Sequence, residues 1–389
     1  MATEAHLHQM RFRNTLTFLS NGFGIGVWSI EIAPVRLIVG ISEAVLGLAL
    51  FGFAAAALLG MRVGARMSDR WPINRVCGVL GLAFAVALFL PCLARDIGTL
   101  VITLILLGAT NGALDVAMNT RGSLIENRYD RPIMSSFHAA WSIGGAAGAA
   151  LAGVLTGFGF GPVIVLSIAA LFVAVSLAAS SGAYQPPAPL ANECSSSCGK
   201  RRQLDPRLAG LCLLAFCALF TEGAIADWSS IYLQGVLESG FAIGFFAFSA
   251  GMSVGRLGGD RAVTRYGRLR VGSLGALIAG LAMAYVLWAP SLGTACICFL
   301  LTGQGMSNVV PMTFSMAGQV TAKTSQGIAM AATFGYTGFL LGPAFIGGLT
   351  HFLTLPLALM VLVITIGVIA LTSQFVFPPK EADYQSARK

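Results

Sequence analysis

Charged residues are scarce in this sequence. Only 10% of its 389 residues are Asp, Glu, Lys or Arg, whereas 56% are apolar. An ordinary soluble domain carries about 25% charged residues, because its surface has to be hydrated. The composition therefore excludes a water-soluble globule.

Patterns that indicate catalysis, metal binding or disulfide bonding are also missing. The sequence has no HExxH, GxSxG or P-loop pattern, which disfavours an integral membrane enzyme. The eight cysteines show no disulfide framework, and Cys194 and Cys198 lack the nearby histidine of a usual zinc site. We therefore expect no enzymatic activity, no metal and no cofactor.

Long apolar runs, in contrast, are abundant. Runs of about 20 residues, the length of an α-helix that crosses a hydrocarbon core, recur along the chain. Strands of a membrane barrel are about ten residues long and alternate in polarity, so these runs predict helices. The predicted fold class is an all-α integral membrane protein with twelve transmembrane helices. The predicted spans are 14-37, 44-66, 75-94, 98-121, 134-157, 161-182, 208-234, 240-263, 270-289, 292-318, 326-349 and 354-377.

The basic residues are distributed unevenly between the connections. Of the 24 Lys and Arg residues, 22 fall at the termini or at even-numbered connections, and Arg36 and Arg95 are the exceptions. Cytoplasmic segments carry an excess of Lys and Arg. The pattern predicts a multi-pass protein of a bacterial inner membrane with both termini in the cytoplasm. The formal net charge of +8 then reflects topology and not nucleic-acid binding.

The sequence divides into two similar halves. Residues 1-182 predict an N-terminal six-helix bundle, 183-206 a cytoplasmic linker rich in Pro and Ser, and 207-389 a C-terminal six-helix bundle. VGARMSDR at 63–70 aligns with VGRLGGDR at 254–261, at an offset of 191 residues. Offsets of 193 or 194 relate further pairs: Gly112 to Gly305, Asp115 to Asn308, Gly144 to Gly338, Gly148 to Gly342 and Gly153 to Gly347. Near-constant offsets indicate a parallel repeat.

The two repeated loops resemble the cytoplasmic loop signature of the major facilitator superfamily, G-x3-D-R-x-G-R-R/K. Asp69 and Arg70 match its Asp-Arg core in the first half, and Asp260 and Arg261 match it in the second. Pro72 departs from the signature, because it stands in place of the second glycine. The resemblance implies two pseudo-symmetric six-helix bundles and a secondary transporter that works by alternating access.

Three longer segments resemble one branch of that superfamily, which includes the rhizopine-transport protein MosC. They are DVAMN at 115–119, FHAAWSIGG at 137–145 and EGAIADWSSIYL at 222–233. Together with the loops, they extend the resemblance over the whole chain.

The resemblance also implies that spans 1, 4, 7 and 10 line a central cavity. The strongly polar residues inside the spans all fall on these four: Asn21, Glu31, Asn111, Asp115, Asn119, Glu222, Asp227, Gln304 and Asn308. Polar residues at membrane depth are costly and usually functional, so we expect these side chains to bind substrate or protons. For Asn21, Asn111 and Gln304, hydrogen bonding between neighbouring helices is an equal alternative.

The carboxylates suggest proton coupling. We expect no Lys or Arg deep in any span, and burial without a counter-charge favours the protonated carboxyl, which can carry a proton. Asp115, Glu222 and Asp227 are the leading carriers. Glu31 is a further candidate, although Arg36 lies near the outer end of the same span. The expected absence of a deep cation also favours a neutral or cationic solute.

Polar aromatic residues favour a sugar-like or polyol substrate, because aromatic faces pack on the apolar faces of such molecules. The candidates are Trp28, His138, Trp141, Trp228 and Tyr336. For each of them, interfacial anchoring or helix packing is an alternative role. His138 is also a candidate second proton site.

The loop residues suggest a gate. We expect Asp69 and Asp260 to cap nearby cytoplasmic helix ends, while Arg70 and Arg261 pair with acidic neighbours and hold one state of the transporter. An alternative is that the arginines only enforce topology.

The predicted function is secondary active transport of a small solute by alternating access, in symport with protons. A proton-coupled exporter of amphipathic compounds or drugs is the alternative. A channel is disfavoured, because a pseudo-symmetric single chain with scattered acids does not form a selectivity constriction. The expected partners are the solute, protons and the lipid bilayer, without nucleic acid, and we expect a monomer.

Overall fold

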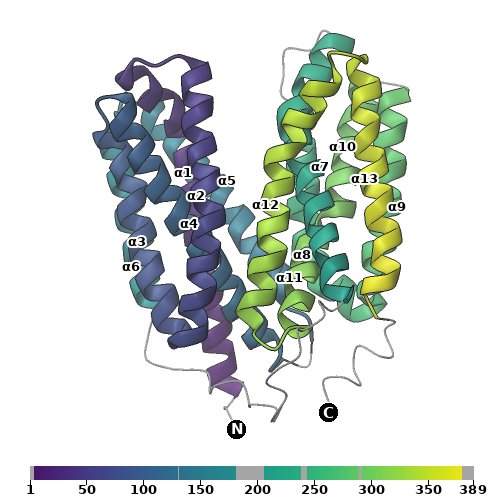
Figure 1. The fold of residues 1–389 in the computed structure, drawn as a ribbon, viewed down its shortest axis with the longest axis horizontal. Helices are drawn as coiled ribbons and strands as arrows, with labels where there is room; N and C mark the ends of the chain where they lie inside the picture. The colour runs from purple at the N-terminus through teal and green to yellow at the C-terminus, as the bar shows by residue number, and fades with distance from the viewer. Residues whose placement is uncertain (1–3, 130, 181–205, 238–242, 289–290, 379–389) are drawn as a thin grey trace, which may run out of the picture. The chain divides into compact units, whose positions relative to one another are not determined.

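Every regular element in the described part of the chain is helical (Figure 1). The structure is a computed structural model, and the residues that it describes are 4–129, 131–180, 206–237, 243–288 and 291–378. The predicted linker 183-206 lies outside the described residues except for Pro206, which begins a helix. Cys194 and Cys198 also lie outside them.

The chain forms two compact units, and each one includes a short segment from the opposite half of the sequence. The N-terminal unit comprises Met1–Tyr129, Phe137–Leu204 and Ala322–Ala329. The C-terminal unit comprises Asp130–Ser136, Asp205–Thr321 and Met330–Lys389. The start of helix α5 therefore belongs to the C-terminal unit, and the start of helix α12 belongs to the N-terminal unit.

The helices follow the predicted spans closely. Those of the first half are α1 (Glu4–Val39), α2 (Glu43–Arg70), α3 (Ile73–Phe89), a 3-10 turn η1 (Leu90–Leu93), α4 (Ile97–Glu126), α5 (Met134–Gly157) and α6 (Pro162–Ser180). Those of the second half are α7 (Pro206–Leu237), α8 (Ile243–Tyr266), α9 (Arg268–Trp288), α10 (Leu292–Met306), α11 (Val309–Gln319), α12 (Thr324–Leu349) and α13 (Leu355–Val376).

Twelve membrane-spanning segments account for these helices, because α10 and α11 together form one span. Within the described residues, eleven of the twelve are long and apolar enough to cross a membrane. The other one, α8, has a comparable length and carries four charged residues, Arg256, Asp260, Arg261 and Arg265. The fold is thus the predicted all-α membrane fold.

One predicted span is interrupted. The sequence predicts a continuous helix over 292-318, but α10 ends at Met306 and α11 begins at Val309. Pro311 explains the break, since a proline has no N–H to donate to the carbonyl four residues earlier. That carbonyl belongs to Ser307, the first residue of the break.

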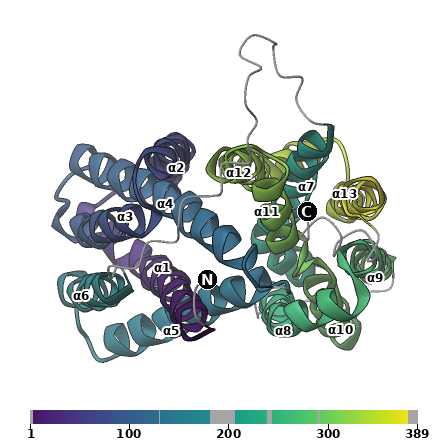
Figure 2. The ribbon, with the colours of Figure 1, turned by 90° about the horizontal axis from the view of Figure 1, so that it is seen from below.

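Glycines bring equivalent helices of the two halves into backbone contact. A Cβ atom added at Gly60 of α2 would lie 2.0 Å from the carbonyl oxygen of Ala109 on α4. One added at Gly251 of α8 would lie 2.0 Å from the carbonyl oxygen of Leu300 on α10. Both residues of the second pair follow those of the first by 191 positions, so the helix pairs α2–α4 and α8–α10 pack in the same way (Figure 2).

The glycines that the repeat aligns in α5 and α12 make matching contacts too. A Cβ at Gly144 would lie 2.1 Å from the carbonyl oxygen of Leu19 on α1, and one at Gly338 would lie 2.3 Å from that of Phe216 on α7. Lipid chains are as apolar as leucine, so close packing of this kind, and not the hydrophobic effect, holds membrane helices together. The repeat is therefore a repeat of helix packing.

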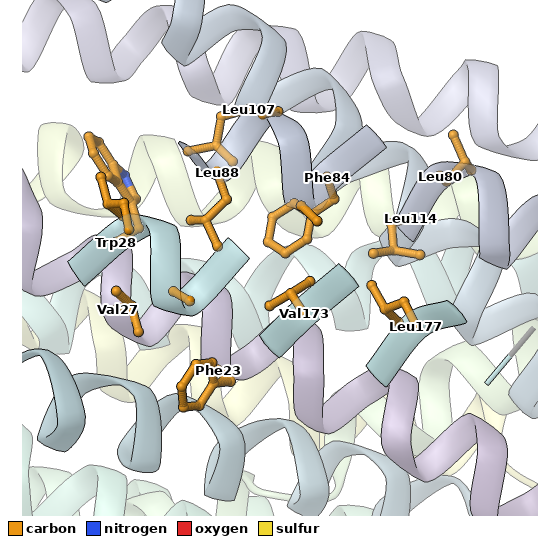
Figure 3. Packing of buried hydrophobic residues seen from close by; sticks show 14 of the residues in the cluster. Phe23, Val27, Trp28, Leu80, Phe84, Leu88, Leu107, Leu114, Val173 and Leu177 are labelled. Carbon is orange, nitrogen blue, oxygen red and sulfur yellow. The ribbon is translucent and has the colours of Figure 1, made fainter. Parts of the chain in front are cut away.

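The core of the N-terminal unit lies between α1, α3, α4 and α6. Figure 3 shows Phe84 and Leu88 of α3 between α1 and α6, with Val173 of α6 beside them. Trp28 of α1 belongs to this cluster and is 4% exposed. This position favours the packing role for Trp28 over a role in a cavity.

Candidate functional site

The polar face of α4 is buried. Asn111, Asp115 and Asn119 follow one another at four-residue spacing, which places them on one face of the helix, and all three are buried. The Nδ2 group of Asn119 donates to the carbonyl oxygen of Asp115 at 2.9 Å and to its Oδ1 atom at 3.2 Å. The Oδ2 atom of Asp115 is also buried, and it has no hydrogen-bond partner among the described residues.

A histidine continues this line of polar groups onto α5. The Nε2 atom of His138 lies 3.2 Å from the Oδ1 atom of Asn119. The amide oxygen can only accept a hydrogen bond, so this contact requires the proton of His138 to sit on Nε2. The ring of Phe18 meets the imidazole edge-on, with ring centres 5.3 Å apart. Asp115, Asn119 and His138 are therefore connected.

A second polar chain joins α1, α4 and α5. The Nδ2 group of Asn21 donates to the Oδ1 atom of Asn111 at 2.9 Å, and the indole N–H of Trp141 donates to the Oδ1 atom of Asn21 at 2.9 Å. Asn21 and Asn111 are buried, whereas Trp141 is half-buried. The sequence-predicted candidates of the N-terminal unit thus lie in two connected groups.

Glu31 lies apart from these groups, near the other end of α1. Its side chain is fully buried, and its Oε1 atom accepts a hydrogen bond of 2.9 Å from the hydroxyl of Thr156 on α5. Its Oε2 atom is buried without a hydrogen-bond partner among the described residues. Thr156 was not among the predicted site residues, because a lone threonine in an apolar span gives no signal.

One of two buried arginines, Arg256 in the middle of α8, overturns the expectation that no cation lies deep in a span. Arg256 of α8 is 6% exposed, and Arg121 of α4 is 2% exposed. Counting charges by connection assigned both to cytoplasmic loops, but α4 and α8 continue past them as helices. The preference for a neutral or cationic solute, which depended on that expectation, loses its basis.

The two buried arginines have different surroundings. The Nε group of Arg121 donates to the Oδ1 atom of Asn14 at 2.8 Å, and its Nη2 group donates to the hydroxyl of Thr17. Arg256 donates through Nε to the carbonyl oxygen of Ser307 at 3.4 Å and interacts electrostatically with Glu222 on α7. Glu222 is half-buried. Arg256 therefore offers Glu222 a counter-charge, which counting charges by connection did not predict.

Asn308 packs against α8. Its Nδ2 group donates to the carbonyl oxygen of Gly255 at 3.2 Å and to the hydroxyl of Ser307 at 2.9 Å. Its Oδ1 atom is buried without a hydrogen-bond partner among the described residues. A Cβ atom at Gly259 would lie 1.8 Å from this oxygen, so the glycine makes room for the amide.

The other candidates of the C-terminal unit are less enclosed. Asp227 and Gln304 are exposed, and Tyr336 is half-buried on α12. The indole N–H of Trp228 donates to the carbonyl oxygen of Pro343 on α12 at 3.0 Å, which favours helix packing for this tryptophan. Within the described part of the chain, no hydrogen bond or ion pair joins these side chains to Glu222.

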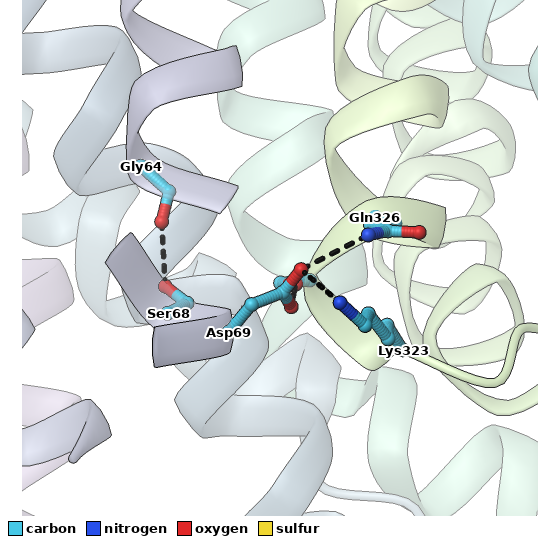
Figure 4. Close-up of polar contacts among 6 residues, drawn as sticks. Gly64, Ser68, Asp69, Lys323 and Gln326 are labelled. Carbon is cyan, nitrogen blue, oxygen red and sulfur yellow. Dashed lines mark hydrogen bonds and ion pairs between the residues drawn. The ribbon is translucent and has the colours of Figure 1, made fainter. Parts of the chain in front are cut away.

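Asp69 lies at the start of α12 (Figure 4). Its Oδ1 atom accepts a hydrogen bond from the hydroxyl of Ser325, and its Oδ2 atom accepts one of 3.0 Å from the Nε2 group of Gln326. The Nζ atom of Lys323 lies 3.3 Å from Oδ2. All of these residues belong to the N-terminal unit. The carboxylate thus lies where the helix dipole favours a negative charge.

Asp260 lies in a matching position at the start of α5. Its Oδ2 atom accepts a hydrogen bond of 3.1 Å from the backbone N–H of Ser136, and both residues belong to the C-terminal unit. The side chains of Arg70 and Arg261 are exposed. The sequence motif identified the two aspartates but not their partners. Nothing in the sequence at the start of α5 or α12 indicates which distant residue that helix start contacts.

Comparisons with known proteins agree with the fold. The family model of the Major Facilitator Superfamily matches residues 15–331. The uncharacterised transporter y4wD of Sinorhizobium fredii is 32% identical over 351 residues, covering 88% of this chain and 92% of that protein. Membrane protein MosC of Rhizobium meliloti is 30% identical over 364 residues, covering 92% of this chain and 88% of that protein.

A solved structure shows the same fold at lower identity. The transporter FucP of Escherichia coli, in its outward conformation, superposes with a TM-score of 0.77 at 15% sequence identity. The match covers 94% of this chain and 98% of FucP. Together with the family match and the twelve spans, it shows that the chain belongs to the major facilitator superfamily and is a multi-pass membrane transporter, not an enzyme.

Proposed function

We propose that this transporter moves a small solute by alternating access and couples that movement to a proton carried by Asp115. The observation that supports it is the environment of the carboxylate, which is buried at the centre of α4 with one oxygen bonded to Asn119 and the other without a described partner. A buried carboxylate with a free oxygen can take up a proton there and lose its charge.

The connection to α5 gives that proton a structural effect. While Asp115 is ionised, its Oδ1 atom holds the Nδ2 group of Asn119, and Asn119 in turn orients His138. Protonation of Oδ2 removes the negative charge from this chain of hydrogen bonds and weakens its hold on the amide. The proton therefore acts on α4 and α5, the helices that also carry Asn111 and Trp141, which we propose below as solute contacts.

We propose a sugar-like or polyol solute. Asn21, Asn111 and Trp141 form a linked set of amide and indole groups on three helices, and hydroxyl groups can exchange with such bonds. FucP is a fucose:proton symporter, so the fold accommodates this activity. We further propose that the protein is a monomer of the bacterial inner membrane with cytoplasmic termini.

We also propose that Asp69 and Asp260 act as gating contacts. Each carboxylate receives hydrogen bonds at the start of a helix, α12 or α5, and the two positions are related by the repeat. Forming and releasing these contacts would favour different states of the transporter.

The proposed function is tested in proteoliposomes. Uptake of radiolabelled myo-inositol, as a probe of the polyol class, is measured with and without an inward proton gradient. We expect accumulation only with the gradient, and we expect Asp115→Asn to abolish accumulation while preserving exchange across the membrane. Equal accumulation in both conditions would contradict proton coupling.

A thermal-shift screen with purified protein tests the substrate class, because a ligand that binds the folded state raises its melting temperature. We expect stabilisation by sugars or cyclitols. Stabilisation by amphipathic drugs alone would favour the exporter instead.

A further inference from the structure

The break between α10 and α11 leaves a buried carbonyl without its usual donor. The N–H of residue 311 would normally donate to the carbonyl of Ser307, but Pro311 has none. The regular pattern resumes one residue later, where the N–H of Met312 donates to the carbonyl of Asn308 at 3.0 Å. Ser307 is fully buried, so its carbonyl oxygen has to be satisfied from within the protein.

Arg256 satisfies it. Its Nε group lies 3.4 Å from this oxygen, and the side chain is almost completely buried. The preceding residue, Gly255, accepts a hydrogen bond from the side chain of Asn308. Two consecutive residues of α8 therefore contact two consecutive residues of the break, one as a donor and the other as an acceptor.

The first half of the chain provides an internal comparison. By the offset of 191, Arg256 corresponds to Ala65, and by the offset of 193, Pro311 corresponds to Met118. Met118 has a backbone N–H, and α4 runs without a break from Ile97 to Glu126. The half that lacks the proline thus also lacks the arginine.

We propose that Arg256 is a positioning residue that replaces the backbone donor missing at Pro311, and that Glu222 of α7 is its counter-charge. Through this arrangement two hydrogen bonds join α8 to the α10–α11 break. The proposal deepens the proposed transport function, on which its uptake arm rests, because it separates two acids that the sequence analysis treated alike. Glu222 serves as the counter-charge of Arg256, whereas Asp115 carries the proton.

A rescue experiment tests the arginine. Arg256→Gln is compared with Arg256→Gln/Pro311→Ala, in which the introduced alanine supplies a backbone N–H to Ser307. We expect Arg256→Gln to lower the melting temperature of the purified protein and to reduce myo-inositol uptake at least about tenfold, the loss typical of breaking a buried charged contact. We expect the added Pro311→Ala change to restore most of both.

The matched control is Pro311→Ala alone, which should keep near-normal uptake. Failure of Pro311→Ala to improve the Arg256→Gln protein in either measurement would overturn the role of Arg256. The melting temperature needs neither a substrate nor a proton gradient, so this arm remains decisive if myo-inositol is not transported.

A charge-neutralisation experiment tests Glu222. We expect Glu222→Gln/Arg256→Gln to be more stable than Arg256→Gln, because no unpaired carboxylate is left in the membrane. Adding Pro311→Ala should then give a protein whose uptake still requires the proton gradient. If that triple variant takes up myo-inositol without depending on the gradient, Glu222 carries the proton and the proposal is wrong.

Discussion

Two side chains at equivalent positions, Asp115 and Asn308, serve different purposes. Asn308 reaches into α8, where Gly259 leaves space for its amide and Gly255 accepts its hydrogen bond. In the first half the position of Gly259 is held by Ser68, whose hydroxyl donates to the carbonyl of Gly64 at 2.7 Å. The serine therefore uses the acceptor that corresponds to Gly255. Asp115 keeps one carboxylate oxygen without a hydrogen-bond partner among the described residues, which suits a proton carrier.

Gly259→Ala tests the fit of the Asn308 amide. The new methyl group would overlap the Oδ1 atom, so we expect the free energy of unfolding to fall by about 1–3 kcal/mol, the usual cost of overpacking. The measurement is the melting temperature in detergent. Gly258→Ala is the matched control, because a Cβ at Gly258 meets nothing within 4 Å. A melting temperature for Gly259→Ala equal to that of the control would contradict this account of Asn308.

At the level of single residues, the sequence identified the acids and amides but not their partners. The positions of Asp115, Asn119 and Asn111 on one helical face follow from their spacing. The burial of Arg256 does not, because it depends on how far α8 continues and on a proline about 50 residues later in the chain. Charge counting assigns such an arginine to the nearest loop.

Among the elements, the helices that carry the polar faces begin in the same way. Asp96 and Thr99 form a capping box at the start of α4, and Ser291 and Thr294 form one at the start of α10, 195 positions later. In each box the side chain of the first residue accepts the backbone N–H of the second. The starts of these two helices are thus fixed by local sequence, which is why their predicted first residues were accurate to within one position.

Ser291→Ala removes the capping oxygen of α10. We expect the free energy of unfolding to fall by about 1 kcal/mol, the usual loss for a serine cap. Ser291→Asp, which keeps an acceptor at the same position, should retain the melting temperature of the parent protein. A melting temperature for Ser291→Ala as high as that of Ser291→Asp would show that the cap does not contribute.

The cap of α4 should depend on pH. The backbone N–H of Thr99 stabilises the charged carboxylate and lowers the pKa of Asp96 from its ordinary value of 3.8. A carboxyl whose pKa is lower in the folded state adds stability above its unfolded pKa and loses it as the pH falls through the folded one. We expect Asp96→Ser, a cap that does not titrate, to be less stable than the parent near pH 7, and the difference to shrink below about pH 4. A difference in melting temperature that is constant with pH would contradict this assignment.

The tenth span has the predicted bounds, but the sequence did not predict the break inside it at Ser307 and Asn308. Its apolar run is continuous from 292 to 318, and a single proline in a membrane helix does not by itself mark a break. Pro311 frees the carbonyl of Ser307 just after the helix ends at Met306, and Arg256 of α8 supplies a tertiary donor to that carbonyl. A feature that depends on another helix is outside what local sequence can predict.

For the whole molecule, the duplicated architecture was predictable because corresponding glycines of the two halves lie at near-constant offsets in the sequence. The glycines of α5 and α12 contact the backbones of α1 and α7 at residues that are themselves 197 positions apart. It was not predictable that each compact unit includes a short segment from the opposite half of the sequence. Asp69 meets the start of α12 and Asp260 the start of α5, and no offset in the sequence indicates these contacts.

Asp69→Asn tests the proposed gating contact. The amide keeps the shape of the carboxylate but loses its charge and one acceptor, so the bonds from Ser325 and Gln326 weaken. We expect the initial rate of uptake in proteoliposomes to fall about fivefold, the factor that corresponds to roughly 1 kcal/mol. Asp260→Asn should have a similar effect through Ser136. Unchanged rates in both variants at equal reconstitution would remove the gating role.

The arginine and proline of the C-terminal unit bear on how the two halves diverged. A proline acquired first would have left the carbonyl of Ser307 without a donor inside the bilayer. An arginine acquired first gives the arrangement of Pro311→Ala, which we expect to keep near-normal uptake. The arginine therefore preceded the proline, and since then the arginine cannot be lost unless the proline is lost before it or with it.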